Sequence, residues 1–419
     1  MTRSERDAFD QRSLVFSVYL PTFLFSVGQG AVIPAVPLFA VHLGASSALA
    51  SLVVGMRGIG TMALDVPGGV LESKLGDKFV MIAGTSLVAA VALGASLSSS
   101  PLQLAVLMLV MGGGWSFWQL ARLAFVSEVV PAHQRGRALS VVGGTNRIGN
   151  FIGPLIGGFV GREFGLTSIF YVQAACGAAA AAVMLFAVTD ANKTPGSAHQ
   201  ETVKVFGALL SAHKRVFATA GFAVVMLQLL RQARQVFLPL WGKSIGLDIA
   251  DISIVFSIST AIDMLLFYPA GHVMDHWGRK WVAVPSLLVL SLSVGLIPLA
   301  HGFGLLALIG LLAGLGNGIG AGIAMTLGAD FAPADARGEF LGVWRFIGDL
   351  GTAGGPVLIG ALAAVASLAA ASGIVAALGA GGAGLLVKLV PEPLQRQQVI
   401  RVDHPGGEGP GPRNEAAGA

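Results

Sequence analysis

The chain has 419 residues, of which 54% are hydrophobic and 11% are charged, and its mean hydropathy is positive. Soluble domains carry about a quarter of charged residues, so this composition excludes a soluble globular protein and indicates a chain that lies in a lipid bilayer. The basic residues number 26 and the acidic residues 22. This excess is expected to reflect membrane topology, so no nucleic-acid partner is expected.

Twelve apolar stretches of about twenty residues or more follow a polar segment over residues 1–13. A bilayer offers no water to backbone groups, and barrel strands would alternate in polarity over about ten residues, so each stretch is predicted to be a helix. The stretches are 14–41, 48–72, 79–99, 102–130, 136–160, 167–189, 214–241, 249–274, 281–300, 303–331, 338–362 and 364–387. The sequence therefore predicts an all-α membrane protein with twelve transmembrane helices.

The second half of the chain repeats the first at one offset of 202 residues (271 − 69 = 202). Glycines and prolines mark special backbone positions, and many obey this offset, including Gly76 with Gly278 and Pro154 with Pro356. Two pseudo-symmetric six-helix bundles are typical of secondary transporters. The predicted parts are a cytoplasmic tail over 1–13, a bundle over 14–189, a cytoplasmic hinge loop over 190–213, a second bundle over 214–388 and a disordered cytoplasmic tail over 389–419.

The lysines and arginines outside the apolar stretches lie almost entirely on one side of the predicted membrane. Eighteen fall on the side of both termini, whereas only Arg162 and Lys243 fall in the loops on the other side. Because cytoplasmic loops retain basic residues, both termini and the hinge are predicted to be cytoplasmic. No cleavable signal is recognisable before the first stretch, so we expect a multi-pass protein of the plasma (inner) membrane.

Each half carries a charged, glycine-containing loop between its second and third stretches. The second copy reads GHVMDHWGRK from residue 271, and the first reads GVLESKLGDK from residue 69. Both resemble the signature Gly-x-Leu-Ala-Asp-Arg-x-Gly-Arg-Lys of the major facilitator superfamily of transporters. The resemblance implies that the Asp of this loop caps a helix of the other half and latches a cytoplasmic gate.

The two copies of the loop do not match that signature equally well. Asp275 stands at the signature carboxylate in the second copy, whereas Ser73 stands there in the first. Either Glu72 supplies the missing carboxylate in the first copy, or the latch of the cytoplasmic gate depends on Asp275 alone. The candidate gating residues are Gly69, Glu72, Gly76, Gly271, Asp275, Gly278, Arg279 and Lys280.

The fifth stretch contains Gly149, Gly153, Pro154, Gly157 and Gly158. This pattern resembles the antiporter motif of the twelve-helix drug:proton antiporter group, which implies export in exchange for protons. The segment is expected to act at the interface between the bundles, although generic close packing of helices is the alternative. Met108 stands where proton-linked members carry a basic residue, which weakens coupling by the usual route.

Nine charged residues lie well inside the apolar stretches, more than two residues from either end, where each one is costly unless it has a partner or faces water. They are Arg57, Asp65, Arg122, Arg147, Arg231, Arg234, Asp263, Arg345 and Asp349. Counting from the cytoplasmic ends of the stretches places Arg147 level with Asp263, and Asp65 level with Arg345. In the superfamily these helices pack across the two bundles, so both pairs are expected to form cross-bundle ion pairs. Asp349 is expected to pair with Arg57 or with Arg345.

Asp263 is the first candidate for proton coupling, because a buried carboxylate is the available titratable group where no histidine lies in mid-span. Asp349 and Asp65 are the next candidates. The candidate cavity residues are Gln29, Arg57, Arg122, Arg231, Arg234 and Asn317. The arginines outnumber the aspartates and favour an anionic or zwitterionic substrate, although Arg231 and Arg234 could instead extend toward water at the membrane surface.

The leading hypothesis is a monomeric, proton-coupled exporter of small amphipathic or drug-like molecules that works by alternating access. The alternative is a carrier or exchanger of an organic anion bound by the cavity arginines. A third hypothesis is a receptor or lipid flippase on the same scaffold. No enzyme, cofactor or metal site is predicted, because no nucleotide loop, metal-ligand spacing or nucleophile motif is present in the sequence. The expected partners are a small-molecule substrate, protons and the lipid bilayer.

Overall fold

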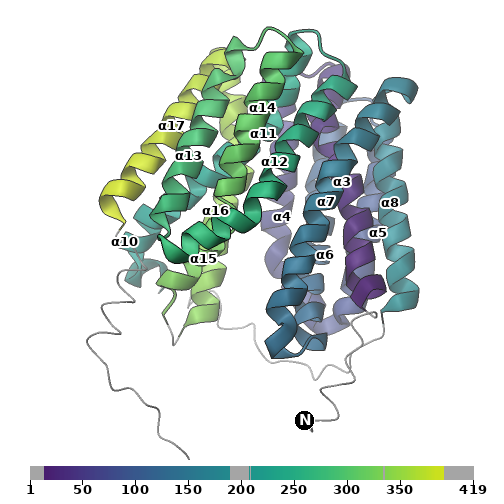
Figure 1. The fold of residues 1–419 in the computed structure, drawn as a ribbon. Coiled ribbons are helices and arrows are strands. Elements are labelled where there is room, and N and C mark those ends of the chain that lie inside the picture. The colour runs from purple at the N-terminus through teal and green to yellow at the C-terminus, as the bar shows by residue number, and fades with distance from the viewer. Residues whose placement is uncertain (1–13, 189–206, 208, 334–335, 391–419) are drawn as a thin grey trace, which may run out of the picture.

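The computed structural model describes residues 14–188, 207, 209–333 and 336–390, and it is helical throughout its regular elements. The N-terminal half consists of η1 (Val15–Tyr19), α3 (Leu20–His42), α4 (Ser47–Leu75), α5 (Asp77–Ser96), α6 (Pro101–Val129), α7 (Ala132–Phe164) and α8 (Ser168–Ala187). Figure 1 shows these helices side by side in one half of the molecule. Both expected tails and most of the expected hinge loop lie outside the described residues.

The C-terminal half stands beside the first and has the same kind of architecture (Figure 1). It consists of α10 (Lys214–Val216), η2 (Phe217–Gly221), α11 (Phe222–Ser244), α12 (Ile249–His276), α13 (Lys280–Leu296), η3 (Ile297–Leu299), α14 (Phe303–Ile319), α15 (Ile323–Phe331), α16 (Arg337–Val365) and α17 (Leu368–Leu389). The expected all-α membrane fold of two six-helix halves is confirmed.

Eleven helices in the described part of the chain are long and apolar enough to cross a membrane. The twelfth expected span, α7, is not among them because its sequence is more polar, with charged residues at 135, 137, 147, 162 and 163. Its 33 residues nevertheless make a helix about 50 Å long, which exceeds the thickness of a bilayer core. α7 packs against α3 of its own half and α12 of the other half, so protein covers much of this polar helix.

The stretch over 303–331 is one candidate membrane span, as expected, but the expectation of one continuous helix is wrong. The chain forms α14 and α15, which are separated by a turn at Gly320, Ala321 and Gly322. Gly322 has a φ of +82°, a conformation that a residue with a Cβ rarely adopts. The glycine run that begins at Gly314 thus has two roles, because it packs a helix closely and then ends it in mid-span.

At the end of the molecule opposite the charged loops, several helices begin with a polar capping residue. Ser46, Ser100, Asp248 and Ser367 each accept a hydrogen bond from a backbone amide in the first turn of α4, α6, α12 and α17. Such caps satisfy amides that have no partner within the helix. We call this end the far end, and we call the end with the loops at Gly76 and Gly278, lower in Figure 1, the motif end.

The two halves meet through α7 with α12 and α4 with α16, and they pack closely toward the far end. A Cβ at Gly158 of α7 would lie 2.6 Å from Ser253 of α12, and one at Gly360 of α16 would lie 2.8 Å from the carbonyl oxygen of Ala48 of α4. Ser257 of α12 also donates a 3.1 Å hydrogen bond to the carbonyl of Phe151 of α7.

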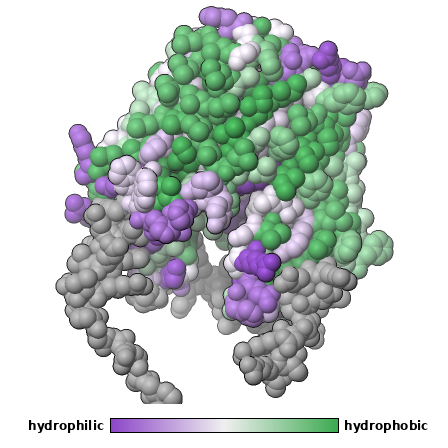
Figure 2. Space-filling model, viewed as in Figure 1, coloured by the Kyte–Doolittle hydropathy of each residue, from purple (hydrophilic) through white to green (hydrophobic). Residues whose placement is uncertain are grey.

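Toward the motif end the same helices leave open space. A Cβ would meet no atom within 4 Å at the glycines Gly136, Gly143 and Gly144 of α7, Gly271 of α12, and Gly338 and Gly342 of α16. Figure 2 shows an apolar surface across the middle of the molecule and a hollow between the two halves at this end. The halves are therefore closed on each other at the far end and open at the motif end.

Candidate functional site

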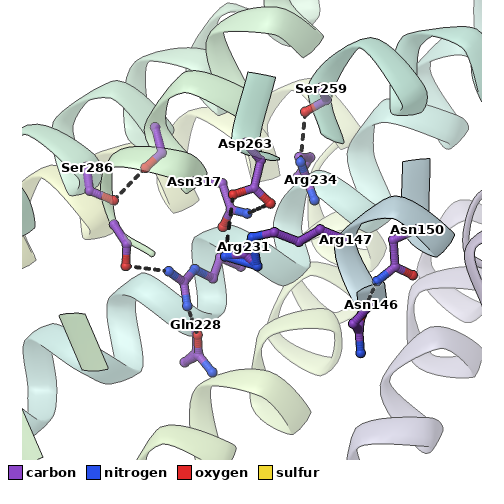
Figure 3. A network of polar contacts seen from close by, with 12 residues as sticks. Asn146, Arg147, Asn150, Gln228, Arg231, Arg234, Ser259, Asp263, Ser286 and Asn317 are labelled. Atoms are coloured by element: carbon purple, nitrogen blue, oxygen red, sulfur yellow. Dashed lines mark hydrogen bonds and ion pairs between the residues drawn. The ribbon is translucent and has the colours of Figure 1, made fainter. Parts of the chain in front are cut away.

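A polar network lies where the middles of α7, α11 and α12 meet the C-terminal end of α14 (Figure 3). Arg147 Nη2 of α7 lies 4.0 Å from Asp263 Oδ1 of α12. Asp263 is buried, with 7% of its surface exposed. The structure thus brings together the two residues that counting from the helix ends had paired, and their contact bridges the two halves.

Asn317 of α14 holds the other oxygen of this carboxylate, because its Nδ2 donates a 2.9 Å hydrogen bond to Asp263 Oδ2. Glycines bring the two helices close enough for this contact. A Cβ at Gly314 would overlap the carbonyl oxygen of Ser259, and one at Gly318 would lie 3.0 Å from the Cα of Asp263. Asn317, a predicted cavity residue, is therefore a direct partner of the candidate proton site.

Arg231 and Arg234 of α11 point into the protein and do not extend toward water. Arg231 Nη1 donates to Gln228 Oε1 at 2.9 Å, and its Nη2 donates to the carbonyl oxygen of Gly320 at 2.8 Å. Arg234 Nη1 donates to Ser259 Oγ at 2.7 Å. The carbonyl of Gly320 lies in the turn where α14 ends and also accepts a 3.3 Å hydrogen bond from the amide of Ile323, so Arg231 adds a second, shorter bond at the helix break.

The network holds more positive than negative charge. Arg231 interacts electrostatically with Asp263, Arg147 and Arg234, and Arg234 also interacts with Asp263. Arg147 further stacks on the ring of Phe267, with its guanidinium carbon 4.2 Å from the ring centroid. Buried atoms without a hydrogen-bond partner are the Nε atoms of Arg147, Arg231 and Arg234 and the Oδ1 atom of Asp263. Three guanidinium groups therefore lie near one carboxylate, and Arg147 is the one at ion-pair distance.

A second cross-half contact joins α4 to α16. Arg345 Nη2 lies 3.2 Å from Asp65 Oδ2, and Arg345 Nε lies 3.8 Å from Asp349 Oδ2 on the next turn of its own helix. Ser116 of α6 donates a hydrogen bond to the other oxygen of Asp65. The structure thus pairs Asp349 with Arg345, the second of the two partners that the sequence left open.

The remaining predicted cavity residues in the N-terminal half lie near a cluster of aromatic rings. The guanidinium carbon of Arg57 lies 5.1 Å from the ring centroid of Trp115, and that of Arg122 lies 4.0 Å from the ring centroid of Trp118. Arg122 also donates to Thr22 Oγ1 at 3.4 Å. Gln29 does not line an open cavity, because only 2% of its surface is exposed and neither amide atom has a hydrogen-bond partner.

Gly76 and Gly278 adopt φ angles of +84° and +115°, which explains why glycine stands at both loop positions. Arg279 is buried and its Nε lies 2.7 Å from Asp330 Oδ2 of α15. The exposed Asp275, the expected latch, lies 3.6 Å from the same arginine on the next turn. Asp330 was not among the predicted residues, although Glu128 stands 202 residues earlier (330 − 128 = 202) and could have indicated an acidic partner.

The antiporter-like segment of α7 faces two different neighbours. A Cβ at Gly149, Gly153 or Gly157 would overlap α3 of the same half, and a Cβ at Gly158 would overlap α12 of the other half. The expectation that the whole segment acts at the interface between the halves is therefore wrong for the first three glycines. They allow α3 and α7 to pack within one bundle, and the pattern of spacing alone did not indicate which helix they faced.

A family model described as Major Facilitator Superfamily matches residues 18–232 and 220–410. The multidrug resistance protein MdtH of Klebsiella pneumoniae is 24% identical over 368 residues, which cover 84% of this chain and 87% of MdtH. The quinolone resistance protein NorA of Staphylococcus aureus is 25% identical over 313 residues, which cover 72% of this chain and 78% of NorA. An uncharacterised transporter of Methanocaldococcus jannaschii is 21% identical over 85% of this chain and 92% of its own length.

Solved structures share the fold at lower sequence identity. The nucleoside transporter NupG has a TM-score of 0.76 and 16% identity, over 89% of this chain and 98% of its own. A POT family transporter in complex with 5-aminolevulinic acid has a TM-score of 0.76 and 13% identity, over 90% of this chain and 95% of its own. These likenesses concern the fold alone. Because the family model covers both halves of the chain, the protein belongs to the major facilitator superfamily and is a multi-pass membrane transporter, not an enzyme.

Proposed function

We propose that the protein is a secondary active exporter of small amphipathic or drug-like molecules, driven by proton exchange. The observation that carries this proposal is the ion pair between Arg147 and Asp263, which joins the two halves near the midpoints of α7 and α12. The names of the relatives MdtH and NorA, which refer to multidrug and quinolone resistance, support export of drug-like molecules. The antiporter-like glycines of α7 agree with this assignment at the level of sequence.

The proposed cycle alternates between two arrangements of the halves. In the present arrangement the far end is closed and the motif end is open. If the motif end is cytoplasmic, as the basic residues predict, substrate enters the hollow from the cytoplasm. Rocking of one half against the other then separates α7 from α12 at the far end and brings the charged loops together at the motif end.

Asp263 is the proposed proton carrier. The charged groups that face it are Arg147 of α7 and Arg231 and Arg234 of α11. Arg147 is the one that belongs to the other half, so separation of α7 from α12 is the movement that couples protonation to the transport cycle.

Cysteine labelling tests the proposed orientation. In a variant lacking Cys176, single cysteines near Arg12, in the hinge and at Arg401 should resist an impermeant thiol reagent in intact cells, whereas one at Lys243 should react. The reason is the asymmetry of the basic residues outside the middles of the spans, of which only Arg162 and Lys243 lie at the far end. The same sites should all react after the membrane is permeabilised, which controls for buried thiols. Labelling of the hinge from outside would place the motif end outside the cell.

Proton release tests the coupling. Adding a transported drug to weakly buffered, purified protein should release protons from the wild type, because substrate binding opposes the protonated state of an antiporter. The Asp263→Asn variant should bind the drug without releasing protons. A Lys243→Gln variant, changed in an exposed residue at the far end, is the control and should behave like the wild type. Equal proton release from Asp263→Asn would move the proton site to Asp349 or Asp65.

Exchange of an organic anion is the second candidate function, and the surplus of arginines around Asp263 favours it. Met108, which is fully buried in α6, also leaves the fourth span without the basic residue of proton-linked members. Reconstituted vesicles distinguish the two functions. Counterflow of an anion at equal pH on both sides, with no movement of protons, would support exchange over proton-driven export.

A further inference from the structure

The broken helix and the arginines of α11 together form a feature that proton transfer does not require. A carboxylate that takes up a proton needs at most one cationic partner, but Asp263 has three guanidinium groups around it. In the part of the chain that the structure describes, no second carboxylate is paired with Arg231 or Arg234. The network therefore has a surplus of two positive charges inside a membrane protein, where uncompensated charge is costly.

The hydrogen bonds of these arginines leave donors free. The two terminal nitrogens of Arg231 donate hydrogen bonds to Gln228 and to the carbonyl of Gly320, both of which are neutral acceptors. Its Nε–H is buried and has no acceptor, and the same is true of the Nε–H of Arg147. Figure 3 shows the end of Arg147 beneath Asp263 and the end of Arg231 beside it, bonded to Gln228 and to the carbonyl oxygen of Gly320. Buried guanidinium donors without acceptors, on two neighbouring arginines, fit a ligand that supplies oxygen atoms with negative charge.

We infer that Arg147 and Arg231 form the binding seat for a carboxylate group of the transported molecule, beside Asp263 at the break between α14 and α15. This inference rests on the proposed transport function and specifies the chemical class of its substrate as amphipathic molecules that carry a carboxylate. A planar guanidinium group matches a carboxylate in a bidentate manner, which an ammonium group would not do. The surplus charge makes a purely cationic substrate unfavourable at this position.

The substrate and Asp263 would then compete for Arg147. Arg147 Nη2 lies 4.0 Å from Asp263 Oδ1 and donates no hydrogen bond to it, so this contact is looser than the 2.9 Å bond from Asn317 to the same side chain. A substrate carboxylate that binds Arg147 leaves Asp263 with Asn317 and with fewer positive neighbours.

A purely structural role for Arg231 makes a different prediction. The arginine caps the carbonyl of Gly320 at the end of α14, and loss of a cap lowers stability regardless of the ligand. If that were its only role, a variant would be less stable but would discriminate between ligands as the wild type does. The ratio of affinities for a charged and a neutral ligand of the same shape therefore separates the two roles.

The test compares aromatic carboxylates with their own amides on purified protein in detergent, by calorimetric titration. Suitable pairs are 1-naphthylacetate with 1-naphthylacetamide, and the corresponding acids and amides with one and three rings. Wild type should bind at least one carboxylate about ten- to a hundredfold more tightly than its amide, as expected for charge-assisted bidentate hydrogen bonds. Equal affinities, or tighter binding of the amide, or no saturable binding of any carboxylate would overturn the inference.

Variants assign the preference to the named residues. Arg231→Gln should reduce the ratio of affinities to near one, while Lys243→Gln, on the exposed far end of the same helix, should leave it unchanged. In Asp263→Asn the carboxylate should raise the melting temperature more than it does in wild type, because it replaces the missing negative charge. An unchanged ratio in Arg231→Gln would leave that residue as a cap only. Loss of proton release with an intact carboxylate preference would refute the proposed export and not this inference.

Discussion

Asp263→Asn is expected to abolish uphill, proton-driven transport and to lower the stability of the protein more than Arg147→Ala does. Removing one partner of a buried ion pair typically costs about 3 to 5 kcal/mol, because the other charge is left without compensation. Loss of Asp263 leaves three guanidinium groups without a carboxylate, whereas loss of Arg147 leaves Asp263 with Arg231 and Arg234 nearby. The upper end of that range is therefore expected for Asp263→Asn. Thermal unfolding in detergent and substrate uptake into inverted vesicles measure the two effects.

The double variant Arg147→Ala with Asp263→Asn should recover part of the stability lost in Asp263→Asn, because one of the stranded positive charges is gone. It should still lack proton-driven transport, since the titratable group is missing. Exchanging the two charges, with Arg147→Asp and Asp263→Arg, should not restore transport. The new guanidinium group would face Arg231 and Arg234 within its own half. Uphill transport by Asp263→Asn alone would exclude Asp263 as the proton carrier.

Gly153→Ala should lower the stability of the protein by about 1 to 3 kcal/mol or more, although it adds a single methyl group. A Cβ at this position would overlap the backbone carbonyl oxygen of Val27 and would lie 2.8 Å from the amide nitrogen of Ala31, so α3 and α7 would have to move apart. Gly143→Ala, on the same helix, is the matched control. A Cβ there meets no atom within 4 Å, so the gain in helix propensity should make it neutral or stabilising by up to about 1 kcal/mol.

Melting temperatures of the two variants, purified in the same detergent, measure this contrast. Transport per folded molecule separates packing from coupling. We expect the Gly153→Ala protein to be lost mainly through reduced folding, with the surviving fraction still able to transport. Wild-type stability together with lost transport would instead assign Gly153 to the coupling mechanism, as the sequence motif had suggested.

The overall fold could be predicted because the bilayer imposes a simple rule on the sequence. Long apolar stretches must be helices in lipid, and the repeat at 202 residues divides them into two halves. The pairing of Arg147 with Asp263 and of Asp65 with Arg345 could also be anticipated, because helices rise by a constant amount per residue and so preserve depth. Depth, however, says nothing about the direction in which a side chain points.

The features that the sequence did not indicate all depend on which neighbour a residue faces. Glycines at helical spacing fit both a straight, closely packed helix and the break that separates α14 from α15, and only the backbone at Gly322 distinguishes them. Arg231 could extend to water or turn inward, and the Gly320 carbonyl that accepts its hydrogen bond lies in a turn only because of that break. Asp330 was overlooked because an acidic residue near a helix end is usually solvated, whereas here it holds the buried Arg279.

Arg345 holds two carboxylates at once, one on its own helix and one on α4 of the other half. When the halves separate along α4 and α16, this arginine keeps Asp349 as a neighbour, so opening does not strand its charge. Arg147 has no acidic residue within one turn on α7, so opening at its position leaves its charge exposed to whatever enters. The contact of Arg345 with Asp65 can therefore open at little energetic cost. Opening of the contact between Arg147 and Asp263 instead depends on a ligand that replaces the lost carboxylate.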